Sequence, residues 1–289
     1  MTGYTTLNEA LAATARTLTA LGDAIEPRRE AEALAAACLG VGRAGLVTRG
    51  DLPLDSSLTA LLERWTQRRA AGEPLAYIVG YRDFWTLRLN VTPAVLVPRP
   101  ETELLVERAL ALARLRGETA APPALADLGT GSGAIALALA SERPDWRIVA
   151  TDRSAAALDI AQRNARAHQL QRVEFLLGDW FTPLAGRRFD LLVSNPPYVA
   201  ADDPALRGDS LRVEPQDALT PGPDALAALV TLIESAPRHL ESGGWLLLEH
   251  GATQAAPVAE RLVARGFSHV RSHADLAGTL RATEGQWLR

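Results

Sequence analysis

A glycine-rich segment directly after a short apolar run constrains the fold of this chain more than any other feature. Residues 124–128 (Ala-Leu-Ala-Asp-Leu) have the length and composition of a buried strand, and Gly129-Thr130-Gly131-Ser132-Gly133 follows at once. Glycine lets the backbone turn sharply and approach a ligand closely, with the amide N–H groups of the next helix exposed. The spacing is one residue shorter than the Gly-x-Gly-x-x-Gly dinucleotide fingerprint. We therefore expect a strand, a ligand-binding turn and a helix.

Strand and helix patterns alternate along the chain from residue 120 onward. Such alternation is typical of an α/β fold whose parallel sheet is covered by helices on both faces. Ligands bind open sheets of this kind at the carboxyl ends of the strands, near the point where the strand order reverses. We expect strands at residues 124–128, 147–151, 173–177, 189–194, 244–249 and 268–271. We expect helices at residues 133–142, 154–168, 223–239 and 253–265.

Acidic residues stand at three successive strand ends of this pattern. Asp127 lies two residues before the first glycine, where a carboxylate can face a ligand ammonium group. Asp152 ends the second strand and is placed to accept hydrogen bonds from both hydroxyls of a ribose. Asp179-Trp180 ends the third, where a carboxylate can accept from an adenine amino group beside an aromatic wall. Each acid alone could cap a helix and Trp180 alone could be core, but together with the glycine loop they indicate a nucleoside ligand.

A second motif, Asn195-Pro196-Pro197-Tyr198, follows the apolar run at residues 189–194 and indicates a place to hold a planar NH2 group. The Asn195 side-chain carbonyl and the Pro196 backbone carbonyl can each accept an N–H of that group, because two prolines make a stiff turn that aims them. Both oxygens would stabilise positive charge that grows on the nitrogen. Tyr198 supplies a flat face. The alternative is a tight surface turn, which does not explain the position after an apolar strand.

The first part of the chain has a different pattern. Apolar residues recur at helical spacing between residues 5 and 72, with Asp55 expected to cap one of the helices. Acids and arginines are nearly equal in number there, so we expect a module that binds a protein partner rather than DNA. Alternation between residues 85 and 97 predicts a β-hairpin. We therefore divide the chain into a helical recognition domain (residues 1–73), a hairpin linker (residues 74–98) and a domain with the ligand site (residues 99–289).

The overall composition narrows the function classes. The 289 residues include 30 Lys plus Arg and 34 Asp plus Glu, which gives a formal net charge of −4. This mild acidity disfavours a protein that gains its affinity from nucleic-acid phosphates. Cys38 is the sole cysteine, so neither an internal disulfide nor a cysteine-rich metal site is expected, and we expect no metal. No apolar run of about 18 residues and no secretory signal are present, so we expect a cytoplasmic protein without membrane contact. We also expect the protein to be a monomer.

The glycine loop and the Asn-Pro-Pro-Tyr turn together resemble the S-adenosylmethionine-dependent methyltransferases that act on amide or exocyclic amino nitrogens. Nearly the whole chain resembles the HemK/PrmC family, which methylates the glutamine of the Gly-Gly-Gln motif in class I peptide release factors. The segments that carry this resemblance are residues 74–80, 84–85, 97–103, 127–133, 178–180, 194–198, 214–219 and 248–251.

The resemblance implies a Rossmann-like methyltransferase sheet, with a small N-terminal helical domain joined to it by a β-hairpin. It implies S-adenosylmethionine as cofactor and a release factor as the protein substrate, methylated at glutamine N5. By that resemblance the glycine loop, Asp152, Trp180 and Asn195 line the cofactor, while residues 195–198 receive the glutamine. The segment at residues 98–103 would lie by the methionine end of the cofactor. Residues 220–222 and 275–281 depart from the family pattern without touching this chemistry.

Three other functions remain open on the sequence. A sister enzyme that methylates a glutamine of a ribosomal protein shares the active-site motif. A DNA or RNA adenine N6-methyltransferase can use the same motif, although it should carry a basic recognition region. A binding module with a decayed methyltransferase fold is the non-enzymatic alternative, against which the intact glycine loop and Asn195 argue.

Overall fold

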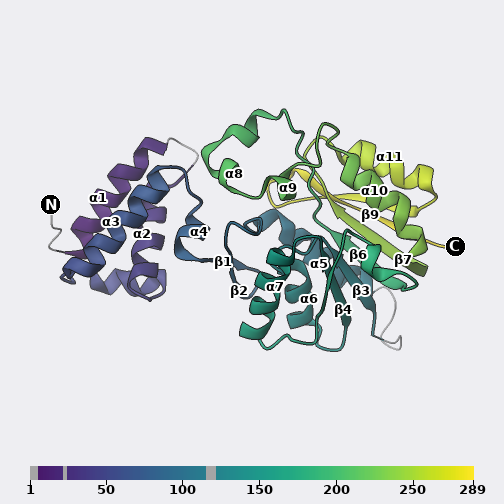
Figure 1. Ribbon diagram of the computed structural model, residues 1–289, viewed down its shortest axis with the longest axis horizontal. Helices are drawn as coiled ribbons and strands as arrows, with labels where there is room; N and C mark the ends of the chain where they lie inside the picture. The colour runs from purple at the N-terminus through teal and green to yellow at the C-terminus, as the bar shows by residue number, and fades with distance from the viewer. Residues whose placement is uncertain (1–5, 22–24, 115–121) are drawn as a thin grey trace. The chain divides into compact units, whose positions relative to one another are not determined.

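The computed structural model describes residues 6–21, 25–114 and 122–289. The chain divides into two compact units. The first, which we call the helical unit, comprises residues 1–80 together with residues 208–213. The second, which we call the sheet unit, comprises residues 81–207 and 214–289. Each unit is described by itself below (Figure 1).

The helical unit is built from α1 (Leu7–Leu18), α2 (Pro27–Cys38), α3 (Ser56–Ala70) and α4 (Leu75–Val79), with 3-10 turns at Thr19–Leu21 and Arg43–Arg49. Thr6 and Glu9 form a capping box at the start of α1. The predicted cap at Asp55 is confirmed, since its carboxylate accepts the backbone N–H groups of Ser57 and Leu58. Pro27 is the first residue of α2, where its missing N–H costs nothing.

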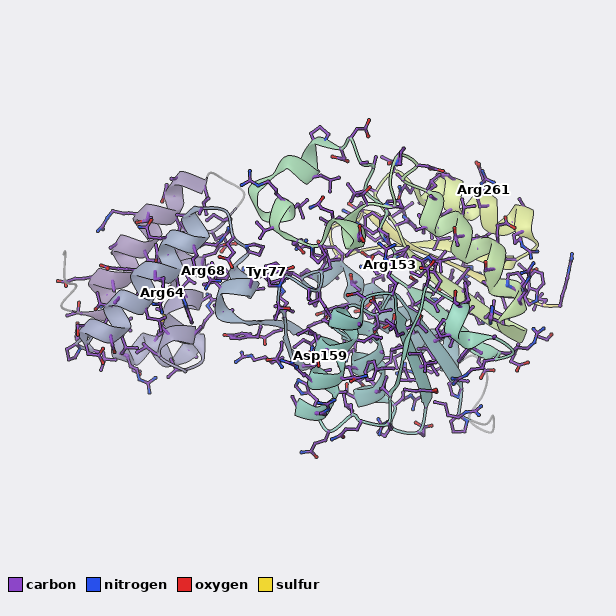
Figure 2. The ribbon with its side chains drawn as sticks, in the orientation of Figure 1. Arg64, Arg68, Tyr77, Arg153, Asp159 and Arg261 are labelled. Atoms are coloured by element: carbon purple, nitrogen blue, oxygen red, sulfur yellow. The ribbon has the colours of Figure 1, made fainter. Side chains whose placement is uncertain are left out.

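The core of the helical unit is a cluster that includes Leu7, Leu18, Leu34 and Leu62. A buried ion pair adds to it, since Arg69 Nε lies 2.6 Å from a carboxylate oxygen of Glu30. Arg64 and Arg68 extend from α3 and Tyr77 from α4 (Figure 2). Among the described residues no single helix is long and apolar enough to cross a membrane; one bent pair, α2 with the turn at Arg43–Arg49, meets the length and composition test when joined.

The hairpin lies earlier in the chain than the sequence indicated. β1 (Tyr81–Phe84) pairs antiparallel with β2 (Leu87–Asn90), and residues 85–86 form the turn. Trp85, expected in a strand, has a φ of +55° in this turn, and residues 95–97 form no strand. The alternation at Leu87 and Leu89 was therefore a true strand signal, but its partner is the preceding segment rather than the following one.

The sheet unit contains seven strands in the order β5-β4-β3-β6-β7-β9-β8. Their bounds are β3 Ala124–Leu128, β4 Arg147–Asp152, β5 Glu174–Leu177, β6 Phe189–Ser194, β7 Leu240–Glu249, β8 Ser268–Ala274 and β9 Leu280–Trp287. The six predicted strands are all present, with shifts at their ends. The strand order reverses between β3 and β6, which places the glycine loop and the Asn195 turn on the two sides of the switch point.

The expectation of a purely parallel sheet is wrong at one edge. β3 to β7 pair in parallel, whereas β9 pairs antiparallel with both β7 and β8. β9 was missed because Leu280–Trp287 holds polar and charged residues that hide its pattern. The result is a mixed sheet, in which a late strand lies between two earlier ones.

Helices cover both faces of this sheet (Figure 1). One core contains residues of α5 (Glu103–Arg114) and α6 (Ala134–Glu142), and α7 (Ala155–Ala167) lies on the same side. The other contains residues of α10 (Ala227–Ser235) and α11 (Ala255–Arg265). Leu191 belongs to the first core and Leu192 to the second. Successive side chains of a strand point to opposite faces of the sheet, and both faces are buried here. Residues 204–219 contain the short elements Pro204–Arg207, α8 (Asp209–Val213) and α9 (Gln216–Leu219), which the sequence did not indicate.

Candidate active site

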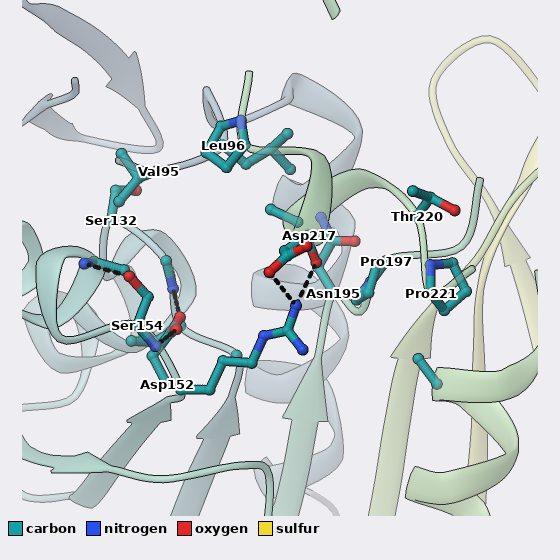
Figure 3. Close-up of a pocket in the computed structure, with 18 of the residues that line it drawn as sticks. Val95, Leu96, Ser132, Asp152, Ser154, Asn195, Pro197, Asp217, Thr220 and Pro221 are labelled. Carbon is teal, nitrogen blue, oxygen red and sulfur yellow. Dashed lines mark hydrogen bonds and ion pairs between the residues drawn. The ribbon is translucent and has the colours of Figure 1, made fainter. Parts of the chain in front are cut away.

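A cavity of about 1090 Å³ opens in the sheet unit at the carboxyl ends of β3, β4 and β6 (Figure 3). Its volume suits a nucleoside-sized ligand. The predicted site residues that line it are Gly129, Thr130, Gly131, Ser132, Asp152, Asp179, Trp180, Asn195 and Pro197. Asp127, Gly133, Pro196 and Tyr198 are not among the lining residues. The structure thus brings residues from four separate loops to one place.

The glycine loop needs glycine for two distinct reasons. Gly129 has a φ of +76°, and a Cβ built on it would stand 2.9 Å from Cζ3 of Trp180. Gly133 has a φ of +86°, and a Cβ there would lie 2.9 Å from Cδ1 of Leu137. Both positions combine a left-handed backbone with a close neighbour, so any side chain would strain the loop and displace what packs on it. α6 begins directly after Gly133 and directs its first amides toward the loop.

Asp127 lies behind the glycine loop rather than in the cavity. Its side chain is fully buried, and Oδ2 accepts the Thr130 hydroxyl at 2.6 Å and the Ala136 backbone N–H at 3.2 Å. Burial raises the pKa of Asp127 to about 7. These two hydrogen bonds tie the loop to the start of α6, and the contact of Asp127 with a ligand ammonium group stays a prediction.

Asp152 lies at the carboxyl end of β4 and points its carboxylate at backbone donors. Oδ2 accepts the Gly131 N–H at 2.9 Å, and Oδ1 accepts the Ser154 N–H at 2.8 Å (Figure 3). Burial raises the pKa of Asp152, while these two backbone hydrogen bonds lower it. A carboxylate has about four lone-pair sites, so each oxygen keeps room for one ligand hydroxyl.

Trp180 and Asp179 line the cavity beyond the end of β5. Trp180 has a φ of +43°, and its carbonyl accepts the Thr151 hydroxyl at 3.0 Å, which fixes the loop to β4. The ring packs against Gly129 and so offers an aromatic wall beside the glycine loop. Asp179 is solvent-exposed at its edge.

Asn195 follows the buried end of β6. Ser194 is fully buried and donates its hydroxyl to the Leu128 carbonyl at 2.6 Å, which locks the ends of β6 and β3 together. Asn195 Nδ2 donates to Thr102 Oγ1 at 3.1 Å, in the short 3-10 turn Pro100–Thr102. The NH2 end of the Asn195 amide therefore faces Thr102, and Oδ1 is the end that can accept a substrate N–H.

Tyr198 is held by its hydroxyl. The hydroxyl donates to Glu249 Oε1 at 3.0 Å, and burial raises the pKa of Tyr198. Gln254 Nε2 donates to the Tyr198 carbonyl at 3.0 Å. Burial raises the pKa of Glu249, which ends β7, to about 7. These contacts fix the Asn-Pro-Pro-Tyr turn from its far end.

Sequence reasoning assigned no role to several residues that shape the cavity. Glu214 accepts the Val97 backbone N–H at 3.0 Å and lies 2.5 Å from Arg99, which lines the cavity. Arg153 and Asp217 form an exposed ion pair of 3.0 Å at the cavity's edge (Figure 3). Glu214 and Asp217 lie in the segment 214–219 quoted for the family resemblance, and Arg153 directly follows the predicted site residue Asp152. Glu249 lies in the segment 248–251 quoted for the family resemblance, and its position as an acid at a strand end was a second signal for the Tyr198 contact.

The residues present fit S-adenosylmethionine. Asp152 keeps acceptor capacity for ribose hydroxyls, and Trp180 offers a flat face for a base. Arg99, about one-third exposed, brings a cation to the cavity, which suits a carboxylate at the methionine end. A ligand site of this kind needs a few convergent polar groups in a largely preformed cavity, and this cavity provides them.

Comparison with known protein families finds a match for each of the two units. Residues 9–80 match the model of the PrmC N-terminal domain. Residues 103–209 match the model of the methyltransferase small domain. The second match spans the glycine loop, Asp152, Trp180 and Asn195.

Relatives cover almost the whole chain. The release factor glutamine methyltransferase of Xylella fastidiosa (strain Temecula1) is 51% identical over 259 residues, covering 90% of this chain and 93% of that protein. That of Escherichia coli K12 is 44% identical, covering 91% and 93% respectively. A solved methyltransferase from Pyrococcus furiosus aligns with a TM-score of 0.51 at 20% identity, covering 70% of this chain and 90% of that one, and so shares the fold.

Proposed function

The chain belongs to the family of release factor glutamine methyltransferases, and we propose that it methylates N5 of the glutamine in the Gly-Gly-Gln motif of class I peptide release factors. The observation that carries this proposal is the position of Asn195. It stands at the edge of a nucleoside-sized cavity, with its NH2 end bound to Thr102 and its carbonyl end available to a substrate amide.

Members of this family use S-adenosylmethionine, and we propose which residues hold it. The loop at residues 129–133 would receive it, with Asp152 accepting from the ribose hydroxyls and Trp180 beside the base. Asp179 would accept from the adenine amino group. Asp127 would act from behind, by keeping Thr130 and the start of α6 in place. When bound, the cofactor supplies an electrophilic methyl group on a sulfonium and leaves as a neutral thioether.

The substrate amide requires activation, since its nitrogen lone pair is delocalised into the carbonyl. Asn195 Oδ1 and the Pro196 carbonyl would accept the two N–H groups and so orient the nitrogen. During methyl transfer positive charge would grow on that nitrogen, and both oxygens would stabilise it. One amide proton then leaves, so no general base is required before methyl transfer. Tyr198, fixed by Glu249 and Gln254, would pack its ring against the planar group.

The helical unit is the proposed recognition element for the release factor. Its exposed surface carries arginines and acids in mixed arrangement, including Arg64 on α3 (Figure 2). A mixed surface suits a protein partner better than a nucleic acid, whose phosphates require clustered positive charge. We propose that the enzyme acts as a monomer without direct contact to nucleic acid.

Incubation with labelled S-adenosylmethionine tests the function directly. Three substrates are compared: a class I release factor, ribosomal protein and duplex DNA. We expect label only in the release factor, with fragment masses placing one methyl group on the Gly-Gly-Gln glutamine. A release factor with that glutamine replaced is the matched control and should stay unlabelled. Label in ribosomal protein or DNA alone would assign the chain to another substrate class.

A further inference from the structure

Asn164 is a fully buried polar residue of α7 that lies outside the lining of the cavity. Its Oδ1 accepts the backbone N–H of Asn90 at 2.7 Å and Nδ2 of the same residue at 2.9 Å. Its Nδ2 donates to the Asn90 carbonyl at 3.1 Å and to the Ser132 carbonyl at 2.9 Å. A carboxamide has two hydrogens to donate and two lone pairs with which to accept, so these four hydrogen bonds satisfy the side chain completely.

The two partners of Asn164 belong to elements that lie far apart in the chain. Asn90 is the last residue of β2 in the hairpin, whereas Ser132 belongs to the glycine loop. Three of the four hydrogen bonds go to Asn90 and satisfy the edge of β2 at that residue. The fourth goes to the loop, and closure of a strand edge does not account for it. One side chain therefore connects the hairpin to the glycine loop.

The peptide between Ser132 and Gly133 is held at both of its polar ends. Its carbonyl oxygen accepts from Asn164, and its N–H donates to the Thr130 carbonyl at 2.9 Å. The two groups of a trans peptide point in opposite directions, so rotation of this peptide would break both hydrogen bonds. Ser132 itself lines the cavity (Figure 3). The hydrogen bond from Asn164 thus acts on the backbone of the cavity wall.

α7 packs directly against this part of the loop. Ala161 lies one turn before Asn164, and its Cβ would be 3.3 Å from a Cβ built on Gly133. Packing alone would favour an apolar side chain at position 164, because burial of an amide costs free energy unless its groups are hydrogen-bonded. The amide at this position is explained by the backbone groups that it binds.

We propose that Asn164 is a positioning residue of the cofactor site, which fixes the Ser132–Gly133 peptide by tying it to β2. The hairpin thereby supports the glycine loop, although none of residues 81–90 lines the cavity. This inference rests on the proposed assignment of the loop to S-adenosylmethionine. A loop that lacks this tie would have to become ordered when the cofactor binds, and the cost of ordering would reduce the affinity.

Two variants of the full-length enzyme test the inference. Asn164→Asp keeps the size but places an oxygen against the carbonyls of Asn90 and Ser132, and Asn164→Ala removes the amide without adding a charge. We expect the calorimetric affinity for S-adenosylmethionine to fall about tenfold in each, as for a buried polar group left unpaired. At saturating cofactor, kcat on the release factor should change by no more than about twofold, because the Asn195 turn is untouched. Wild-type affinity in both variants would overturn the inference.

Asn90→Ala is the matched control at the other end of the connection. It removes only the hydrogen bond between Asn90 Nδ2 and Asn164 Oδ1, and it leaves the bond from Asn164 to Ser132 in place. Cofactor affinity should therefore stay near the wild-type value. A loss as large as that in Asn164→Ala would show that the bond to the loop is not the cause, and it would overturn the inference.

Thr283→Val separates positioning from general stability. Thr283 is a fully buried threonine of β9 whose hydroxyl hydrogen-bonds to His250 and Ser272. This variant should lower the free energy of unfolding and leave cofactor affinity unchanged, because the glycine loop is not involved. If affinity fell in proportion to stability in Thr283→Val and in the Asn164 variants alike, the role of Asn164 would be merely structural, which would overturn the inference.

Backbone amide exchange, followed by NMR without cofactor, tests the inference without an activity measurement. The Gly133 N–H should lose protection in both Asn164 variants, because its peptide is no longer held at the carbonyl. The Gly129 N–H, which donates to the Thr151 carbonyl at 2.9 Å, should keep its protection. Unchanged exchange at Gly133 would overturn the inference. A wild type that binds no S-adenosylmethionine would instead refute the proposed function, while exchange at Gly133 still decides whether Asn164 fixes the peptide.

Discussion

Gly129 and Trp180 are in such close contact that a Cβ on the glycine would stand 2.9 Å from Cζ3 of the ring. The two residues follow different strands, β3 and β5, which are separated in the sheet by β4. The absence of a side chain at position 129 therefore determines where the aromatic wall of the cavity lies.

Gly129→Ala should weaken cofactor binding by about tenfold or more, because overpacking of this kind costs about 1–3 kcal/mol. Isothermal titration with S-adenosylmethionine measures it. Gly186→Ala is the matched control: its φ of +75° nearly equals the +76° of Gly129, but nothing lies within 4 Å of the new Cβ. Both variants should lose about 1–2 kcal/mol of stability from backbone strain. Equal affinities in the two variants would contradict the role given to the Trp180 contact.

Asp152→Ala should weaken binding of S-adenosylmethionine by about 1–3 kcal/mol, the cost of leaving polar groups unpaired. The variant loses the acceptor for Gly131 N–H as well as the proposed acceptor for the ribose. Ser154→Ala serves as control, since it removes the cap on the Ala157 N–H and leaves the carboxylate in place. It should reduce unfolding free energy by about 1 kcal/mol with little change in affinity. Tight binding of a nicotinamide dinucleotide by the wild type would contradict the whole assignment of this cavity.

Asn195→Ala should reduce turnover by about 10²–10³, comparable to loss of one oxyanion-hole donor. Stability should change little, because the side chain lies at the cavity and its hydrogen bond to Thr102 is only partly buried. Asn195→Asp keeps the shape and an acceptor but adds a negative charge near the proposed sulfonium position. We expect partial activity with cofactor affinity retained or raised. Initial rates of release-factor methylation measure the turnover of both variants. Wild-type turnover in Asn195→Ala would refute the mechanism.

The stability of the enzyme should depend on the protonation of Asp127. Burial raises its pKa from 3.8 to about 7 in the folded protein, so the folded state holds the proton more tightly than the unfolded state. This group's contribution is therefore greatest below about pH 4, declines as the pH rises toward about pH 7, and is constant above. Asp127→Asn removes that decline. Denaturant unfolding at several pH values should show the variant gaining on the wild type across this window, and a constant difference would contradict the prediction.

Deletion of residues 1–72 should leave cofactor binding nearly intact and abolish productive capture of the release factor. Calorimetry with S-adenosylmethionine verifies that the remaining sheet unit is folded, and methyl transfer to the intact release factor is then compared. Full efficiency in the shortened enzyme would show that recognition lies elsewhere.

The sequence predicted those parts of the fold whose residues repeat with a clear period. Strands such as β3 and β6 are short apolar runs. Their ends could be predicted because Gly129 and Asn195 come directly after these runs. β9 escaped prediction because polar and charged residues within Leu280–Trp287 hide its strand pattern. Its position is set by pairing with β7 rather than by local preference, which a single segment does not reveal.

The site was predictable to the extent that a residue's position on its strand decides where it points. Asp152, Trp180 and Asn195 reach the cavity as expected. Asp127 does not, since whether an acid beside a glycine turn faces inward or outward depends on the register of the strand. Thr102 and Asn195 lie 93 positions apart, and their hydrogen bond exists only in three dimensions.

The interior position of β9 has a consequence for the order of synthesis. Among the strands that the structure describes, β8 pairs with β9 alone, although it precedes β9 in the chain. While a ribosome is still translating residues 268–279, the segment that becomes β8 has no partner in the sheet, and the outer edge of β7 is uncovered. Unpaired strand edges are prone to association with other chains. The nascent enzyme therefore depends on β9 to complete the sheet, and a pause just before residue 280 would leave both β8 and the outer edge of β7 unpaired.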